Sequence, residues 1–327
     1  MNPGPIPLQS PLPSLIHDGR EIVDMRRYLG LDLGGTSIKS IILDVDGDQP
    51  TTTGFRSTPA EADGGPTHVI DRIVAIGRDI GDEFGPFHGV GLGVPGLFDA
   101  DTGTIELFPN LPGPWKGQPI RDAVAEGLVS DVAIINDARA FSLAESHLGA
   151  GKGCTTVVCL TLGTGVGGGV VIGGRVHLGA WGVAGEIGHQ IVQPDGPVCG
   201  CGNRGCVEVL AQAETLARLA GKESAEAVYR AAREGEERSR QAIETTAHWL
   251  GIGLANTVAV LGPDRIIIGG GILDAGDLAL DPIRRVVRER VTLVPPGEIE
   301  VVAAELGPTA GAVGAALAAH QSSSTTA

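Results

Sequence analysis

Three cysteines crowd into one short segment, and a histidine precedes them. Cys199, Cys201 and Cys206 stand in the sequence CGCGNRGC, and His189 lies ten positions before the first of them. Three thiolates and one imidazole are a typical ligand set for tetrahedral zinc, and four protein ligands leave no position for an activated water. The segment therefore predicts a structural zinc. Reduced cysteines without metal are the alternative, and an iron–sulfur cluster would lack its fourth thiolate.

Asn136 and Asp137 form a second candidate, where an apolar run, Val132 to Ile135, gives way to a helical pattern. In an α/β sheet, ligands collect at this end of a strand. A carboxylate there can accept the proton of an attacking hydroxyl during phosphoryl transfer. The alternative is that either residue only caps the helix that follows.

Acidic residues also surround the cysteine segment. Glu186 and His189 belong to the sequence GEIGH, and Glu208 stands two positions after Cys206. Carboxylates in such positions suit pairs of sugar hydroxyls, because they accept hydrogen bonds through both oxygens. The alternatives are solvated surface charge and hydrogen-bonded support of the metal ligands.

Glycine-rich turns follow three predicted strands. The first turn, DLGGTSIK from Asp32 to Lys39, leads into another strand, so it fits neither the Walker lysine pattern nor the dinucleotide fingerprint. The second runs from Gly163 to Gly169, and the third is Gly269 to Gly271. Such turns let backbone N–H groups approach phosphate oxygens, and Asp32 is available to a magnesium shell. For each turn alone, an ordinary structural turn is the alternative.

The composition argues against several classes of function. A formal net charge of -15 and 3% aromatic residues do not suit a nucleic-acid surface, which needs clustered basic residues and stacking rings. The chain has no apolar run long enough to cross a membrane, and its first residues lack the pattern of a secretory signal. We expect a cytoplasmic protein that binds neither nucleic acid nor membrane.

The order of predicted elements indicates a duplicated α/β fold with a cleft between its halves. A strand, a glycine turn and a strand begin at Tyr28, and the plan recurs from Thr155, with its second strand expected over Val170–Ile172. Residues 212–260 are expected to be mostly helical. The proline-dotted residues 1–26 are expected to form a mobile tail.

Jointly, these motifs make the chain resemble the ROK family of bacterial repressors, open-reading-frame proteins and sugar kinases, within the actin-like sugar kinase superfamily. The resemblance runs from about Tyr28 to Ala319. It rests on four segments of the sequence: DLGGT at 32–36, NDA at 136–138, residues 162–189 with their EIGH, and CGCGNRGCVE at 199–208.

The resemblance implies an α/β fold of two domains, the actin-like ATPase or ribonuclease H-like fold, with an interdomain cleft. The small α/β domain is expected to comprise residues 27–140 and 307–322. The large α/β domain, which carries the zinc loop, is expected to comprise residues 141–306.

The resemblance also implies roles for individual residues. The position that matches Asp137 is the base that receives the proton of the sugar's primary hydroxyl, and His189 is the fourth zinc ligand. The residues expected to hold the sugar are Asn110, Asn136, Asp137, Glu186, His189 and Glu208. The residues expected to hold ATP, with Mg²⁺ near the first of them, are Asp32, Gly34, Gly35, Thr36, Lys39, Gly163, Thr164, Gly165, Gly167, Gly269, Gly270 and Gly271. Arg139 departs from the family pattern, because many glucose-phosphorylating members have asparagine there, and this leaves the preferred hexose open.

The implied function is ATP-dependent phosphorylation of a hexose at its primary hydroxyl, with conversion of glucose to glucose 6-phosphate as the leading reaction. The alternatives are a kinase for N-acetylglucosamine, N-acetylmannosamine or fructose, and a sugar-sensing transcriptional regulator of the same family. A regulator is expected to carry an N-terminal helix-turn-helix domain, for which the residues before Tyr28 are too few. A catalytically silent sugar-binding protein would need a defective Asp137 or phosphate turn. We expect ATP rather than inorganic polyphosphate as the donor, and a homodimer or homotetramer.

Overall fold

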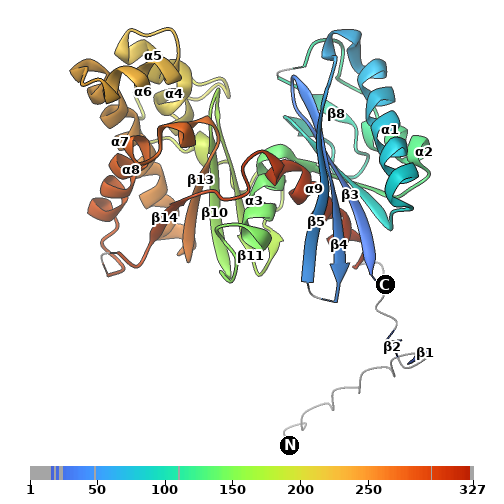
Figure 1. Ribbon diagram of the computed structural model, residues 1–327. Helices are drawn as coiled ribbons and strands as arrows, with labels where there is room; N and C mark the ends of the chain where they lie inside the picture. The colour runs from blue at the N-terminus through green and yellow to red at the C-terminus, as the bar shows by residue number, and fades with distance from the viewer. Residues whose placement is uncertain are drawn as a thin grey trace, which may run out of the picture.

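The computed structural model describes residues 16–17, 20–21, 25–47, 49–109, 111–295 and 297–324 (Figure 1). Asn110 and most of the predicted tail, residues 1–26, lie outside the described residues. Within that tail, β1 (Ile16–His17) pairs antiparallel with β2 (Arg20–Glu21). From residue 25 onward the chain forms two α/β lobes, each built on a five-stranded mixed sheet. No helix in the described ranges is long and apolar enough to cross a membrane.

The first lobe is built on a sheet with the strand order β5-β4-β3-β6-β9. Its strands are β3 (Arg26–Leu33), β4 (Ser37–Asp46), β5 (Gln49–Pro59), β6 (Gly89–Val94) and β9 (Val132–Asn136). The first three pair antiparallel, β6 pairs parallel with β3, and β9 pairs parallel with β6. Smaller elements of this lobe are η1 (Ala62–Gly64), β7 (Leu97–Phe98) and β8 (Ile105–Leu107).

Both faces of the central strands β3 and β6 are buried, because side chains alternate between the two faces along each strand. Leu29, Leu31 and Leu33 of β3 join the apolar core that contains α1 (Gly65–Phe84) and α2 (Ile120–Leu128). On the opposite face lies α9 (Ala310–Ser323), which comes from the other end of the chain. Gly30 faces α9 so closely that any side chain there would overlap the backbone of the helix. The glycine lets helix and sheet pack in direct contact.

The second lobe is built on a sheet with the order β12-β11-β10-β13-β14. Its strands are β10 (Thr156–Leu162), β11 (Val166–Ile172), β12 (Arg175–Val176), β13 (Arg265–Gly269) and β14 (Glu300–Ala303). Its helices are α4 (Val207–Ala211), α5 (Ala213–Ala220), α6 (Ala225–Arg233), α7 (Glu237–Leu261) and α8 (Asp277–Arg290). Its short 3-10 turns are η2 (Ile187–His189) and η3 (Gly271–Ala275), whereas η4 (Gly307–Thr309) contacts α9 and β4 of the first lobe.

Two helices lie between the lobes. α3 (Asp137–Leu148) packs on β10 and β11 of the second sheet, α9 packs on β3 and β6 of the first, and the two helices pack against each other (Figure 1). The chain therefore crosses between the lobes where β9 meets α3 and where β14 leads to α9. The expected boundary at residue 140 falls inside α3.

One predicted strand boundary is wrong. The second strand of the second unit, expected over Val170–Ile172, is β11 and begins at Val166, so Gly167, Gly168 and Gly169 pair with β10 instead of forming a turn. A side chain at Gly167 would come within 2.7 Å of Thr161 Oγ1, and one at Gly168 within 2.6 Å of the Gly185 carbonyl. These strand glycines therefore allow neighbouring segments to approach the sheet closely.

Candidate functional site

The first turn of α3 is fixed by Asn136. The Oδ1 of Asn136 accepts hydrogen bonds from the backbone N–H groups of Ala138, at 3.1 Å, and Arg139, at 3.3 Å, which is helix N-capping. Its Nδ2 donates to the Gly96 carbonyl at 3.2 Å, just after β6. Capping, the alternative interpretation of this residue, is thus present, and it orients the helix that carries Asp137.

Asp137 is the first residue of α3, and its carboxylate lies beside the carboxylates of two other segments. Its side chain is open to solvent, and its Oδ1 accepts the backbone N–H of Ala138 at 2.8 Å. Desolvation by the surrounding protein raises the pKa of Asp137, and the negative charge of Glu186 adds to the rise, while the Ala138 N–H opposes it. None of the ion pairs among the described residues includes Asp137. A reachable carboxylate with a raised pKa suits a general base.

Glu186 and Arg139 form an ion pair that the sequence did not reveal. Arg139 Nη2 lies 3.3 Å from Glu186 Oε1 and also donates to the Gly182 carbonyl. The guanidinium is buried, whereas the Glu186 side chain is 37% exposed. The pair therefore ties the segment before η2 to the helix that carries Asp137. The available signal in the sequence was an arginine in the first turn of a buried helix. Its partner, Glu186, lies 47 positions away, so the sequence alone did not indicate the pair.

The predicted zinc ligands lie together. One ligand atom from each of His189, Cys199, Cys201 and Cys206 falls within 4.8 Å of the others. The Sγ atoms of Cys201 and Cys206 are 3.7 Å apart, close to the edge of about 3.8 Å expected for a tetrahedron with Zn–S bonds of about 2.3 Å. His189 Nδ1 lies 3.8 Å from Cys199 Sγ, so this ring nitrogen faces the thiols. The clustering is confirmed, and the donor set fits a structural zinc.

Glu208 lies between the cysteine cluster and the second glycine turn. Its Oε1 is 3.7 Å from Cys199 Sγ and 3.9 Å from His189 Nδ1, and its Oε2 accepts the backbone N–H of Val166 at 3.0 Å. The alternative of support for the metal ligands is therefore consistent with its position. The same carboxylate fixes the backbone at the start of β11.

The first glycine turn lies at the end of β3. Gly34 N–H donates to the Ser37 carbonyl at 2.9 Å, and Gly35 and Thr36 are exposed. Asp32 is buried beneath the turn, 3.7 Å from Lys39 Nζ. Burial raises the pKa of Asp32 to about 6; Lys39 lowers it, and the nearby charge of Asp137 adds to the rise. The structure thus brings Asp32, from the first lobe, near Asp137 at the start of α3.

The second and third glycine turns meet at one edge of the second sheet. Gly163 and Thr164 are exposed between β10 and β11, and the Gly163 N–H donates to the Gly165 carbonyl at 3.0 Å. Gly270, at φ 89°, lies so close to Leu162 that a side chain there would come within 2.7 Å of the Leu162 nitrogen. Backbone from both turns is therefore available to one ligand at this edge.

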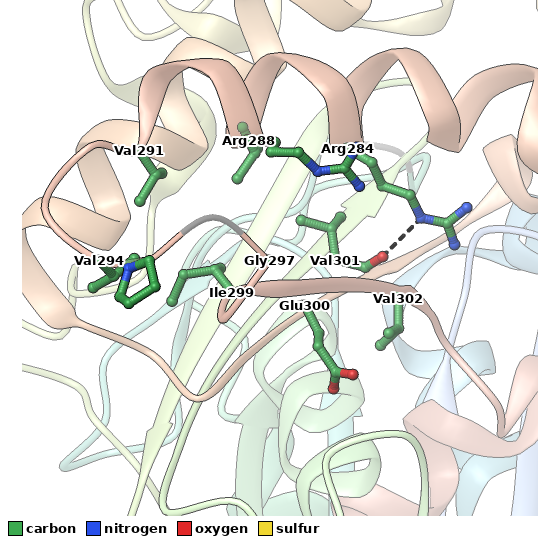
Figure 2. A pocket seen from close by; sticks show the side chains of 11 residues that line it. Arg284, Arg288, Val291, Val294, Gly297, Ile299, Glu300, Val301 and Val302 are labelled. Atoms are coloured by element: carbon green, nitrogen blue, oxygen red, sulfur yellow. Dashed lines mark hydrogen bonds between the residues drawn. The ribbon is translucent and has the colours of Figure 1, made fainter.

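A cavity elsewhere in the second lobe is not part of this site. It measures about 300 Å³ and lies between α8 and β14, where Arg284 donates through Nε to the Val301 carbonyl at 2.9 Å (Figure 2). None of the predicted site residues lines it. The residues predicted for the chemistry thus lie outside this cavity.

Comparison with known proteins shows which family the sequence matches. Residues 28–322 match the sequence model of the ROK family. A glucokinase of Thermotoga maritima is 36% identical over 310 residues, which make up 89% of this chain and 96% of that protein.

Two solved structures share the fold. A ROK hexokinase from Thermus thermophilus gives a TM-score of 0.80 at 34% identity, covering 91% of this chain and 99% of that chain. A ROK family glucokinase from Streptomyces griseus, in complex with glucose and AMPPNP, gives a TM-score of 0.74 at 33% identity, covering 90% of this chain and 99% of that chain. The predicted two-domain α/β fold is thereby confirmed.

Proposed function

Since this chain belongs to the ROK family, we propose that it is an ATP-dependent sugar kinase that transfers the γ-phosphoryl group to the primary hydroxyl of a hexose. Glucose is the leading acceptor, and glucose 6-phosphate the product. The observation that carries the proposal is Asp137, an accessible carboxylate with a raised pKa at the start of α3, close to Asp32 and Glu186. The Streptomyces griseus relative, which binds glucose and an ATP analogue, supports both substrates.

In this proposal Asp137 accepts the proton of the hexose hydroxyl while that oxygen attacks the γ-phosphorus and ADP leaves. Most of the rate enhancement comes from orientation and from charge stabilisation. The exposed backbone of the three glycine turns, with Thr36, Thr164 and Lys39, binds the phosphates and the nucleoside. Asp32 would hold Mg²⁺, which neutralises phosphate charge when bound.

The hexose is held by Asn136, Glu186, His189 and Glu208, together with Asn110 outside the described residues. Because His189 Nδ1 faces the thiols, its Nε2 is left for a sugar hydroxyl. Zinc on the Cys3His set would fix the orientation of this ring. The metal would thus affect sugar binding without taking part in the chemistry.

The proposed domains are a small α/β domain, residues 27–140 with 307–322, and a large domain, residues 141–306. We place the protein in the cytoplasm as a homodimer or homotetramer. Packing of α9 on the first sheet supports the assignment of residues 307–322.

The test is release of ADP across a panel of hexoses and amino sugars, with ATP or polyphosphate as the donor. We expect ATP-dependent turnover with the highest kcat/KM for glucose. A higher value for N-acetylglucosamine, N-acetylmannosamine or fructose would change the substrate but keep the reaction. The family also includes xylose repressors, and a sugar that binds without any ADP release would favour the regulator instead.

A further inference from the structure

Arg139 is a buried cation two residues after Asp137, in the first turn of α3. The Arg139 side chain is only 11% exposed, and its two acceptors, the Gly182 carbonyl and Glu186 Oε1, come from one segment of the second lobe. A buried arginine is stable only when its charge is matched and its N–H groups are bonded. Arg139 therefore fixes the position of the Gly182–Glu186 segment relative to α3.

One donor of Arg139 is unused. The Nε–H is buried and has no hydrogen-bond acceptor among the described residues. An unpaired buried donor is unfavourable, and such donors are rare in native proteins. One N–H group of the guanidinium thus lacks a hydrogen bond, beside the Glu186 carboxylate that we assign to the hexose. A ligand oxygen or a water is needed to accept this hydrogen bond.

We propose that Arg139 is a positioning residue that determines hexose binding: its guanidinium holds the Glu186 carboxylate and the Gly182 carbonyl against the first turn of α3, and so aligns the hexose with Asp137. The inference rests on the proposed function. It concerns the acceptor side of the site only, since the hydrogen bonds and the ion pair of Arg139 among the described residues go to Asn136, Gly182 and Glu186 and not to the nucleotide turns.

The charges around Asp137 support this role. The negative charges of Glu186 and Asp32 interact with that of Asp137. Glu186 is paired with Arg139, and Asp32 is paired with Lys39. Arg139 therefore offsets the one negative charge that Glu186 brings toward the base. Without it, Asp137 would keep its proton to a higher pH.

The experiment compares Arg139→Met and Arg139→Lys with the unaltered chain, measuring kcat and the KM of both substrates from pH 5 to 9. We expect Arg139→Met to raise the glucose KM about tenfold and to leave the ATP KM within about twofold. The acid limb of kcat/KM should move to higher pH. Arg139→Lys should restore the acid limb, because the charge returns, but not the glucose KM, because an ammonium lacks the planar fork that serves two acceptors.

Arg284→Met is the matched control. Arg284 also bonds a carbonyl, that of Val301, and a carboxylate, that of Asp277, but it lies at the cavity of Figure 2, away from the site. We expect its kinetics to match the unaltered chain.

Two results would overturn the inference. One is an unchanged glucose KM and acid limb in Arg139→Met; the other is an equal rise in both KM values in a variant that melts at the normal temperature. If Arg139→Met does not fold, the same criteria apply to Arg139→Lys, with an unchanged glucose KM overturning the inference. If the unaltered chain releases no ADP with any hexose, the proposed function itself fails and this inference with it.

Discussion

The carboxylate of Glu145 accepts the backbone N–H of Leu306 at 2.8 Å, although the two residues are 161 positions apart. Glu145 is fully buried on α3, and its oxygens also accept the N–H groups of Ala150, at 3.0 Å, and Glu305, at 3.1 Å. A buried carboxylate is stabilised by several N–H donors of this kind. Glu145 therefore fixes the segment through which the chain passes from β14 back to α9.

Replacing Glu145 with Gln should lower the free energy of unfolding by about 2–4 kcal/mol, because the amide NH₂ cannot accept and one or more buried backbone N–H groups lose their partner. Urea unfolding followed by circular dichroism measures this. Glu298→Gln, on an exposed side chain, is the control and should change stability by less than about 0.5 kcal/mol. Equal effects of the two substitutions would show that the Leu306 contact contributes nothing.

Asp137→Asn should reduce kcat by about 10²–10⁴-fold while glucose still binds, because the hydroxyl proton loses its acceptor and the shape of the site is kept. ADP release measures turnover, and calorimetry measures glucose affinity. Asp131→Asn, at the opposite end of β9, is the control and should keep normal turnover. A normal rate in the Asp137→Asn variant would contradict the role of Asp137 as the base and leave it only a structural role at the start of α3.

Much of the fold was predictable, because local patterns determined it. The strand, glycine turn and strand expected from Tyr28 are β3 and β4, and residues 212–260 are mostly helical. β5 carried no such signal: it has no buried residue, and its polar side chains show no apolar alternation. The start of β11 was missed because glycines that normally mark turns here serve close packing.

The site was predictable only where its members are close in sequence. His189 and the three cysteines lie within one stretch, and their clustering is confirmed. The Arg139–Glu186 pair depends on how a loop of the second lobe folds back on α3, which no local pattern encodes. The predicted roles of the sugar and nucleotide residues stay predictions.

Stability should depend on pH through Asp32. Its pKa rises from 3.8 in the unfolded chain to about 6 in the fold, so between about pH 4 and 6 the folded state holds a proton that the unfolded state has lost. The contribution of Asp32 to the free energy of unfolding is therefore fully present below about pH 4. This contribution falls by about 3 kcal/mol as the pH rises through about 6. The Asp32→Asn variant should not lose this stability, because asparagine does not ionise.

Urea unfolding without magnesium, at pH 4 and at pH 7, tests the effect of Asp32. We expect the stability of Asp32→Asn, relative to the unaltered chain, to increase by about 2–3 kcal/mol between the two values. Asp79→Asn, on the exposed face of α1, should show no such increase. A constant difference for Asp32→Asn would mean that Lys39 fully compensates the burial of the carboxylate.

Removing zinc should raise the glucose KM about tenfold and leave the ATP KM within about twofold, because the metal orients the His189 ring and not the nucleotide turns. Cys201→Ser removes one ligand without opening the core, since Cys201 is exposed, and elemental analysis establishes whether metal is lost. Cys154→Ser is the control, because Cys154 lies outside the cluster and should keep both metal and kinetics. A metal-free Cys201→Ser variant with the normal glucose KM would show that the zinc has no influence on sugar binding through His189.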